Sequence, residues 1–322
     1  MHAAIRRRAW QDGRVTVVIV APGQGSQTPG FLDPWLAEPH FADHLAELSD
    51  AAGVDLRAHG TVSDADTIRD TAVAQPLIVG ASLLSLDAVL DARRDRIAGI
   101  AGHSVGEVAA AAGAGILNEA DAMRFVAARG RAMADAAARS ETGMSAVIGA
   151  DESELMAALE PLGLSPANLN GGGQIVVAGE LHALSALQAN PPAGARVIPL
   201  QVAGAFHTRY MEPAVDTMRE LASGIVAQHP KLRIWTNRDG SIVGDGPRYL
   251  DLLVGQIASP VRWDLVMESF AANGVTGLVE LAPAGALVGL AKRALKGLPT
   301  VAVKTPDDIP AAQALIDQEA AA

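Results

Sequence analysis

The residues best suited to covalent chemistry lie in segment 102–106, Gly-His-Ser-Val-Gly, which has the Gly-x-Ser-x-Gly pattern of a nucleophile elbow. A short apolar strand is predicted to end at Ala101, and an alanine-rich helix follows from Val108. Flanking glycines suit such a turn, because it forces the serine backbone to strained angles. Ser104 would project at the positive end of a helix, where an anionic intermediate is stabilised. The pattern alone fits a small-residue turn equally well.

A second candidate is Gln24, in the glycine-punctuated loop 21–27 that follows the β-branched run 15–20. The loop lacks both the Gly-x-Gly-x-x-Gly spacing and a Gly-Lys-Ser triplet, which disfavours phosphate binding. Ligands of open α/β sheets bind beside the carboxyl ends of strands. Gln24 could present an amide to a developing oxyanion there, and a polar turn residue is the alternative.

The third candidate is Arg129, in a helix predicted from an N-cap at Asn118 to about Arg139. At about 100° per residue, Arg129 falls in the apolar arc that holds Phe125 and Met133. A guanidinium aimed at a core is costly unless it meets a carboxylate. Two interpretations remain open. One is a structural ion pair or a snorkelling side chain, and the other is a receptor that grips a substrate carboxylate.

Among the eight histidines, His207 is the best candidate for a general base. It lies where the predicted strand 197–202 gives way to a helix. His103 precedes the serine and is expected to point to the other side of the elbow. The others occupy polar or terminal settings without a motif: His2, His40, His44, His59, His182 and His229. A lone histidine can equally be structural, so elimination does not assign the role.

The elements that must position these side chains follow an alternating order. Strands and helices alternate on both sides of segment 141–205, which predicts an α/β fold with a mainly parallel sheet. Within that segment the order strand, helix, strand, strand, helix, strand is ferredoxin-like. A cleft between this insertion and the main body is a natural ligand site. The main-body elements are expected at 15–20, 41–52, 75–94, 97–101, 118–139, 232–235, 249–258, 261–272, 275–281, 285–296, 300–303 and up to about 318.

Composition narrows the function classes. The 322 residues contain no cysteine, which excludes disulfides, thiolate metal sites and a catalytic cysteine. A net charge of -11 argues against nucleic acid as a partner. No apolar run is expected to reach the roughly 20 residues of a membrane span, and nothing resembles a secretory signal, so we expect a cytoplasmic protein. Residues 1–14 are expected to form a flexible extension.

Together these motifs resemble bacterial malonyl-CoA:acyl carrier protein transacylases, and through them the acyltransferase domains of fatty-acid and polyketide synthases. The resemblance covers nearly everything after residue 15. It implies an α/β-hydrolase-like large subdomain, residues 15–140 and 206–322, with a ferredoxin-like small subdomain, residues 141–205, inserted into it. The matching stretches, in the family's order, are Gly23 to Gln27, Gln75-Pro76, Gly102 to Glu107, Arg129-Gly130 with Met133, Asn170 with Gln174, Gly204 to His207, Asn237, Pro260 to Trp263 and Glu280 to Gly285.

The resemblance also implies a role for each candidate. Ser104 would be the acylated nucleophile and His207 its general base. Gln24 and the backbone amide of Val105 would form the oxyanion hole, and Arg129 would hold the free malonyl carboxylate. The remaining family positions are Met133 and Asn170 in the pocket, Phe206 as the bulky residue associated with malonyl units, and Gln256, near the position whose carbonyl orients the histidine.

The implied activity is transfer of a malonyl group from malonyl-CoA to the phosphopantetheine thiol of acyl carrier protein, for fatty-acid or polyketide synthesis. It would pass through a malonyl-serine without a metal or cofactor. A monomer is expected, and the basic side chains of Lys292, Arg293 and Lys296 are predicted to face the acidic carrier protein.

Two alternatives come from other classes. A serine esterase or thioesterase of α/β-hydrolase type shares the elbow but places Asp or Glu between the serine and the histidine in chain order, and no acid in that interval carries a motif. A non-catalytic carrier-protein scaffold is disfavoured by the co-occurrence of Ser104, His207, Gln24 and Arg129.

Overall fold

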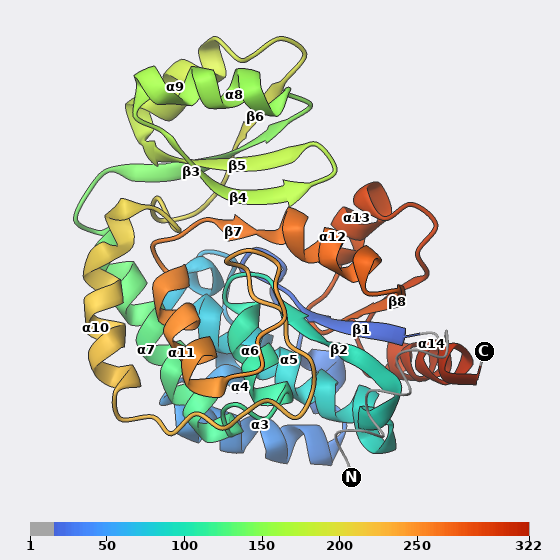
Figure 1. Cartoon of the computed structure of the whole chain (residues 1–322). Coiled ribbons are helices and arrows are strands. Elements are labelled where there is room, and N and C mark those ends of the chain that lie inside the picture. The colour runs from blue at the N-terminus through green and yellow to red at the C-terminus, as the bar shows by residue number, and fades with distance from the viewer. Residues whose placement is uncertain (1–15, 322) are drawn as a thin grey trace.

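Two β-sheets organise the chain in this computed structural model, which describes residues 16 to 321 (Figure 1). The first is parallel, with the strand order β2-β1-β8-β9. Its strands are β1 (Thr16–Ala21), β2 (Ile97–Gly102), β8 (Val275–Glu280) and β9 (Thr300–Ala302). The predicted α/β fold is confirmed. The predicted extension, residues 1–14, lies outside the described residues.

The register of the parallel sheet brings three loops to one edge. Val20 of β1 pairs with Ala101 of β2 on one side and with Glu280 of β8 on the other. Parallel strands end at a common edge, so the loops that follow β1, β2 and β8 start side by side. The first two of these loops contain Gln24 and Ser104.

Helices cover both faces of this sheet, which explains the continuous apolar run of β1. Val17 and Ile19 belong to one buried cluster, whereas Val18 and Val20 belong to another on the opposite face. The first cluster is covered by α3 (Pro39–Ala52), α5 (Thr71–Leu90), α6 (Gly106–Gly113), α7 (Glu119–Ala137), α10 (Glu212–Ala222), α11 (Gly246–Gln256) and α14 (Ile309–Ala321). The second is covered by α12 (Trp263–Ala272) and α13 (Ala286–Ala294).

Helix α5 and the turn after it form the one described stretch, Thr71–Arg96, that is long and apolar enough to cross a membrane. The expectation that no apolar run reaches this length is therefore wrong. However, 83% of its most apolar window is buried inside the fold. An all-round apolar surface is also what a helix at the centre of a core needs.

The second sheet confirms the ferredoxin-like order of the insertion. Its elements are β3 (Thr142–Ile148), α8 (Glu152–Leu159), β4 (Ser165–Gly171), β5 (Gln174–Glu180), α9 (Leu181–Ala189) and β6 (Arg196–Pro199). They form the upper part of Figure 1, with the strand order β6-β3-β5-β4. The short strand β7 (Val261–Arg262) then pairs in parallel with β4 and adds a fifth strand. The sheet therefore runs past the insertion into the chain after it, and subdomain boundaries at 140 and 205 stay a prediction.

Several expected elements differ from the structure in their bounds or their type. The helix expected over 75–94 runs over Thr71–Leu90 instead. The predicted strand 232–235 is not formed, because Ile234 and Trp235 each make only an isolated bridge. The helix expected over 261–272 begins at Trp263, since the two residues before it pair with β4. The strand expected over 197–202 ends at Pro199.

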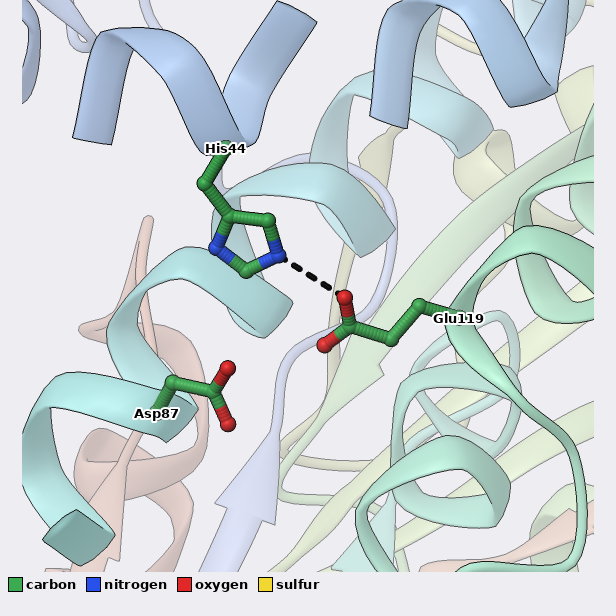
Figure 2. A group of neighbouring side chains, drawn as sticks. All are labelled: His44, Asp87 and Glu119. Atoms are coloured by element: carbon green, nitrogen blue, oxygen red, sulfur yellow. Dashed lines mark hydrogen bonds and ion pairs between the residues drawn. The ribbon is translucent and has the colours of Figure 1, made fainter. Parts of the chain in front are cut away.

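A charged cluster joins three helices of the large subdomain (Figure 2). His44 Nε2 on α3 lies 2.8 Å from Glu119 Oε2 at the start of α7, and this hydrogen bond raises the pKa of His44. Asp87 on α5 lies beside them, and its own pKa is raised by burial and then by the charge of Glu119. Such a trio could ligate a cation. However, both carboxylates already have partners: Glu119 is hydrogen-bonded to His44, and Arg94 lies 3.2 Å from Asp87.

We predict that His44→Ala destabilises the fold in a pH-dependent way. The folded pKa of His44 is raised, so its stabilising contribution is complete below the unfolded value and disappears as pH rises through the folded value. Because the pair is partly exposed, the loss should be about 0.5 kcal/mol at about pH 5.5 and smaller at about pH 8.5. Urea unfolding of both proteins at the two pH values measures it. An equal loss at both would contradict the assignment.

Candidate active site

The elbow between β2 and α6 forms as predicted. Ser104 has a φ of 53°, in the left-handed region that side chains rarely adopt. A Cβ added to Gly102 would lie 2.0 Å from the backbone of Gly106, and one added to Gly106 would lie 2.2 Å from the carbonyl oxygen of Ala21. The two glycines are therefore required by the close approach of the backbone on either side of the serine.

The hydroxyl group of Ser104 contacts His207, the histidine that the sequence analysis proposed as the general base. Ser104 Oγ lies 2.7 Å from His207 Nε2, and His207 Nδ1 lies 2.9 Å from the backbone carbonyl oxygen of Gln256. A carbonyl oxygen only accepts, so the ring proton resides on Nδ1 and Nε2 is free to accept from the serine. Burial, followed by the charge of Arg129, lowers the pKa of His207 to about 3. The imidazole is therefore neutral and able to act as a base.

The chain holds His207 in an unusual backbone conformation. Its φ is 62°, and its N–H donates to the carbonyl of Ile257. The preceding segment is tied to the start of the second sheet, because Ala205 N donates to Thr142 Oγ1 over 3.0 Å. His207 therefore lies where the chain leaves the insertion and returns to the large subdomain.

Two backbone N–H groups beside the serine have no acceptor among the described residues: those of Gln24 and Val105. The side-chain amide of Gln24 instead donates to the carbonyl of Arg69, at 3.2 Å. One of the two hydrogens on Nε2 is therefore used away from the serine, whereas the backbone N–H of Gln24 has no acceptor among the described residues. A part for Gln24 in an oxyanion hole stays a prediction, and the backbone N–H is the donor that the structure leaves available for it. Gly23 packs against His103, which brings the backbone of Gln24 to the elbow.

Arg129 is buried, with 1% of its surface exposed, and ends beside the serine. Its Nη1 donates to Gln75 Oε1 over 2.6 Å, and its Nη2 donates to Gln256 Oε1 over 2.8 Å and to Ser104 Oγ over 3.5 Å. No carboxylate of residues 16–321 forms a salt bridge with it, so neither a structural ion pair nor a snorkelling side chain describes Arg129. Neutral acceptors leave its positive charge uncompensated by direct contact, which suits the binding of an anionic group.

Sequence reasoning missed the polar contacts of two residues, Asn237 and His103. Asn237 Oδ1 accepts from the N–H of Ser104, and Asn237 Nδ2 donates to the carbonyl of Gly102, both over 2.7 Å. His103 was expected on the other side of the elbow, but its Nε2 lies 2.9 Å from Asn170 Oδ1, and its ring lines the cavity. Asn237 belongs to the stretches that carry the family resemblance, and this was the available signal.

A cavity of about 330 Å³ lies between the two sheets and opens onto Ser104 and His207. Three of the predicted binding residues line it: Met133, Asn170 and Phe206. Arg129 and Gln256 are not lining residues. Arg129 reaches the site through its 3.5 Å contact with Ser104 Oγ, and Gln256 through its contacts with Arg129 and His207. Arg293 of α13 also lines the cavity. The arrangement can form an acyl-serine and hold an anionic acyl group within a cleft of ligand size.

Comparison with known proteins agrees with this geometry. The acyl transferase domain family matches residues 18–313. The chain is 50% identical to the malonyl CoA-acyl carrier protein transacylase of Mycobacterium tuberculosis, over 91% of this chain and 98% of that protein. It is 35% identical to the Escherichia coli K12 protein of the same name, over 91% and 97%.

Solved structures give the same result. The crystal structure of MCAT from Mycobacterium tuberculosis matches with a TM-score of 0.88 and 49% identity, covering 92% of this chain and 99% of that one. A type II PKS acyl-carrier protein in complex with its malonyl-transacylase matches with a TM-score of 0.87 and 32% identity, covering 93% and 99%. This chain, with its serine elbow, buried arginine and inserted ferredoxin-like unit, belongs to the acyl transferase family.

Proposed function

We propose that this protein transfers a malonyl group from malonyl-CoA to the phosphopantetheine thiol of an acyl carrier protein, through a malonyl ester of Ser104. The observation that carries the proposal is the buried Arg129 guanidinium, which has no carboxylate partner among the described residues and lies 3.5 Å from the Ser104 hydroxyl. A malonyl group on that oxygen is short, and its free carboxylate can meet the guanidinium. The related proteins named above bear this activity in their names.

In the first half-reaction His207 Nε2 accepts the Ser104 proton while the oxygen attacks the thioester carbon. The backbone N–H groups of Gln24 and Val105 are the donors for the oxyanion. The carbon–sulfur bond then breaks, and His207 returns the proton to the coenzyme A thiolate. In the second half-reaction the pantetheine thiol gives its proton to His207 and takes the acyl group, and Ser104 recovers its proton. The scheme balances without a resident cofactor.

The contact made by Nδ1 of His207 does not support the esterase alternative. His207 Nδ1 faces the carbonyl of Gln256 rather than an Asp or Glu carboxylate, so the contact that completes a hydrolase triad is made here by backbone. The direct contact between Ser104 and His207 likewise disfavours a non-catalytic scaffold. We also propose that the protein acts as a monomer in the cytoplasm.

The carrier protein needs a local basic surface, because this chain has a net charge of -11 and carrier proteins are acidic. Lys292 and Arg293 lie in the last turn of α13, and Lys296 follows. All three are exposed, and Arg293 also lines the cavity, so this group borders the entrance to Ser104. We propose that they form the docking face.

The decisive experiment for the proposed function is an acceptor test. With malonyl-CoA alone, intact mass should show a malonyl adduct, and added holo-carrier protein should discharge it to malonyl-carrier protein. Ser104→Ala should show neither, because the attacking oxygen is gone. Free malonate forming equally fast with and without carrier protein would show a thioesterase instead.

Arg129→Ala should lower kcat/KM for malonyl-CoA by about 100-fold, because a charge-assisted contact with the carboxylate is lost. The acetyl group has no carboxylate, so kcat/KM for acetyl-CoA should stay the same or increase. Parallel steady-state assays with the two thioesters measure the ratio. A matching loss for both would argue against a carboxylate receptor.

Charge reversal on the docking face, Lys292→Glu with Lys296→Glu, should raise KM for the carrier protein roughly fivefold and weaken its salt dependence, because rim charges steer association. KM for malonyl-CoA should change less. The control for the change in net charge is Arg57→Glu, on α4 (Leu56–Thr61), combined with Arg131→Glu, on α7, because both double variants change the charge by the same amount and both arginines are exposed. If carrier-protein KM stays at the wild-type value, another surface docks the carrier.

A further inference from the structure

Glu107 is a buried acid to which the mechanism above assigns no role. It lies in the first turn of α6, shortly after Ser104, and 1% of its surface is exposed. Burial of a carboxylate is costly unless hydrogen bonds satisfy it. Its Oε1 accepts from the N–H of Asn237 over 2.8 Å and from the hydroxyl of Tyr249 over 3.2 Å, and its Oε2 accepts from Gln256 Nε2.

These contacts determine which way the side-chain amide of Gln256 faces. An ionised carboxylate only accepts, so Gln256 must turn its Nε2 toward Glu107, and that nitrogen also donates to the carbonyl of Ser104 over 3.0 Å. The amide oxygen then faces Arg129 Nη2 at 2.8 Å. The reversed amide would put its oxygen against the carboxylate and its N–H groups against the guanidinium, two repulsive contacts.

We infer that Glu107 is a positioning residue for acyl-group selection: it fixes the amide of Gln256, and the amide oxygen fixes Arg129 beside Ser104. This rests on the proposed function and extends it. Glu107 makes no direct hydrogen bond to Ser104, His207 or Arg129 in the described structure, so it acts on the malonyl carboxylate only through Gln256.

Glu107→Gln keeps the shape of the side chain and tests this directly. The N–H of Asn237 can only donate, so it keeps the oxygen of the new amide on its side. The new NH₂ group then faces Gln256, whose amide must turn its oxygen toward it and away from Arg129. The guanidinium loses an acceptor that held it at the serine.

The negative charge of Glu107 should have the opposite effect on acyl-group preference from its positioning of Gln256. Its negative charge stabilises the protonated form of Arg129 but also offsets the positive potential that attracts a malonyl carboxylate. If charge were its main effect, Glu107→Gln would increase the preference for malonyl over acetyl. If positioning is its main effect, the preference must fall. The sign of the change therefore separates the two roles.

The pH dependence of the wild type provides a second readout. Burial raises the pKa of Glu107 to about 7, against the opposing effects of its hydrogen bonds and of Arg129. When protonated, the carboxyl group can also donate, and it no longer fixes the amide of Gln256. The titratable groups that act on it, or lie beside it in the site, do not change charge between about pH 6 and 8. The pKa of His207 is about 3, burial lowers that of Arg129 only to about 10, and burial raises that of Tyr249.

The experiment measures the ratio of kcat/KM for Ser104 acylation by malonyl-CoA and by acetyl-CoA, at about pH 8.5, where Glu107 is ionised. Glu107→Gln should lower this ratio about tenfold, the size of one lost hydrogen bond to a charged group. Tyr249→Phe is the matched control. It removes another donor from the same carboxylate but not the Gln256 contact, so the ratio should stay within about twofold.

The wild-type ratio should also fall between about pH 8 and pH 6, and the ratio of Glu107→Gln should be flat over that range. An unchanged or higher ratio in Glu107→Gln, or a flat wild-type profile, overturns the inference. The pH profile of the wild type tests the inference even if Glu107→Gln does not fold. If the wild type forms no malonyl adduct, the proposed function fails; if it does and the ratios do not respond, only the role of Glu107 fails.

Discussion

Gln256, at the end of α11, connects the reacting groups of this site. Its backbone carbonyl fixes the proton on His207, and its side-chain oxygen holds Arg129. Its side-chain nitrogen contacts Glu107 and the carbonyl of Ser104. A displacement of this one residue would therefore disturb His207 and Arg129 together. Residues that act as such a unit have strongly non-additive effects when they are changed.

The electrostatics of the site follow from placing an arginine and a histidine in the same buried space. Arg129 lies against neutral amide oxygens, and burial lowers its pKa to about 10, which leaves it charged at neutral pH. The same positive charge, added to burial, keeps His207 neutral. The charge of Arg129 therefore has one effect that the structure shows, which is to disfavour protonation of His207, and one that belongs to the proposed function, which is to attract an anionic acyl group.

The two sheets enclose the cavity because the small sheet is continued by the large subdomain. Strand β7 pairs with β4, and α12 follows it directly, so the insertion is held over the edge where β1 and β2 end. Asn170 at the end of β4 then reaches His103 of the elbow. Residues from both sheets therefore form the site, and its cavity depends on the pairing of β7 with β4.

The sequence by itself determined the features that depend on local spacing. The elbow around Ser104, the inward direction of Arg129 and the strand and helix order of the insertion all follow from glycine placement and from apolar periodicity. The family resemblance added the roles that the residues alone left open. These features could be predicted because each depends on residues that are close together in the chain, within a few turns or strands.

Only the tertiary structure decided contacts between segments far apart in the chain. The side chain of Gln24 donates to Arg69, His103 turns to Asn170, and segment 232–235 makes isolated bridges instead of a strand. The amide of Gln256 is oriented by Glu107 from another helix. The physical reason is the same throughout: a polar side chain turns toward whichever partner packing brings within hydrogen-bonding distance, and local sequence does not contain that partner.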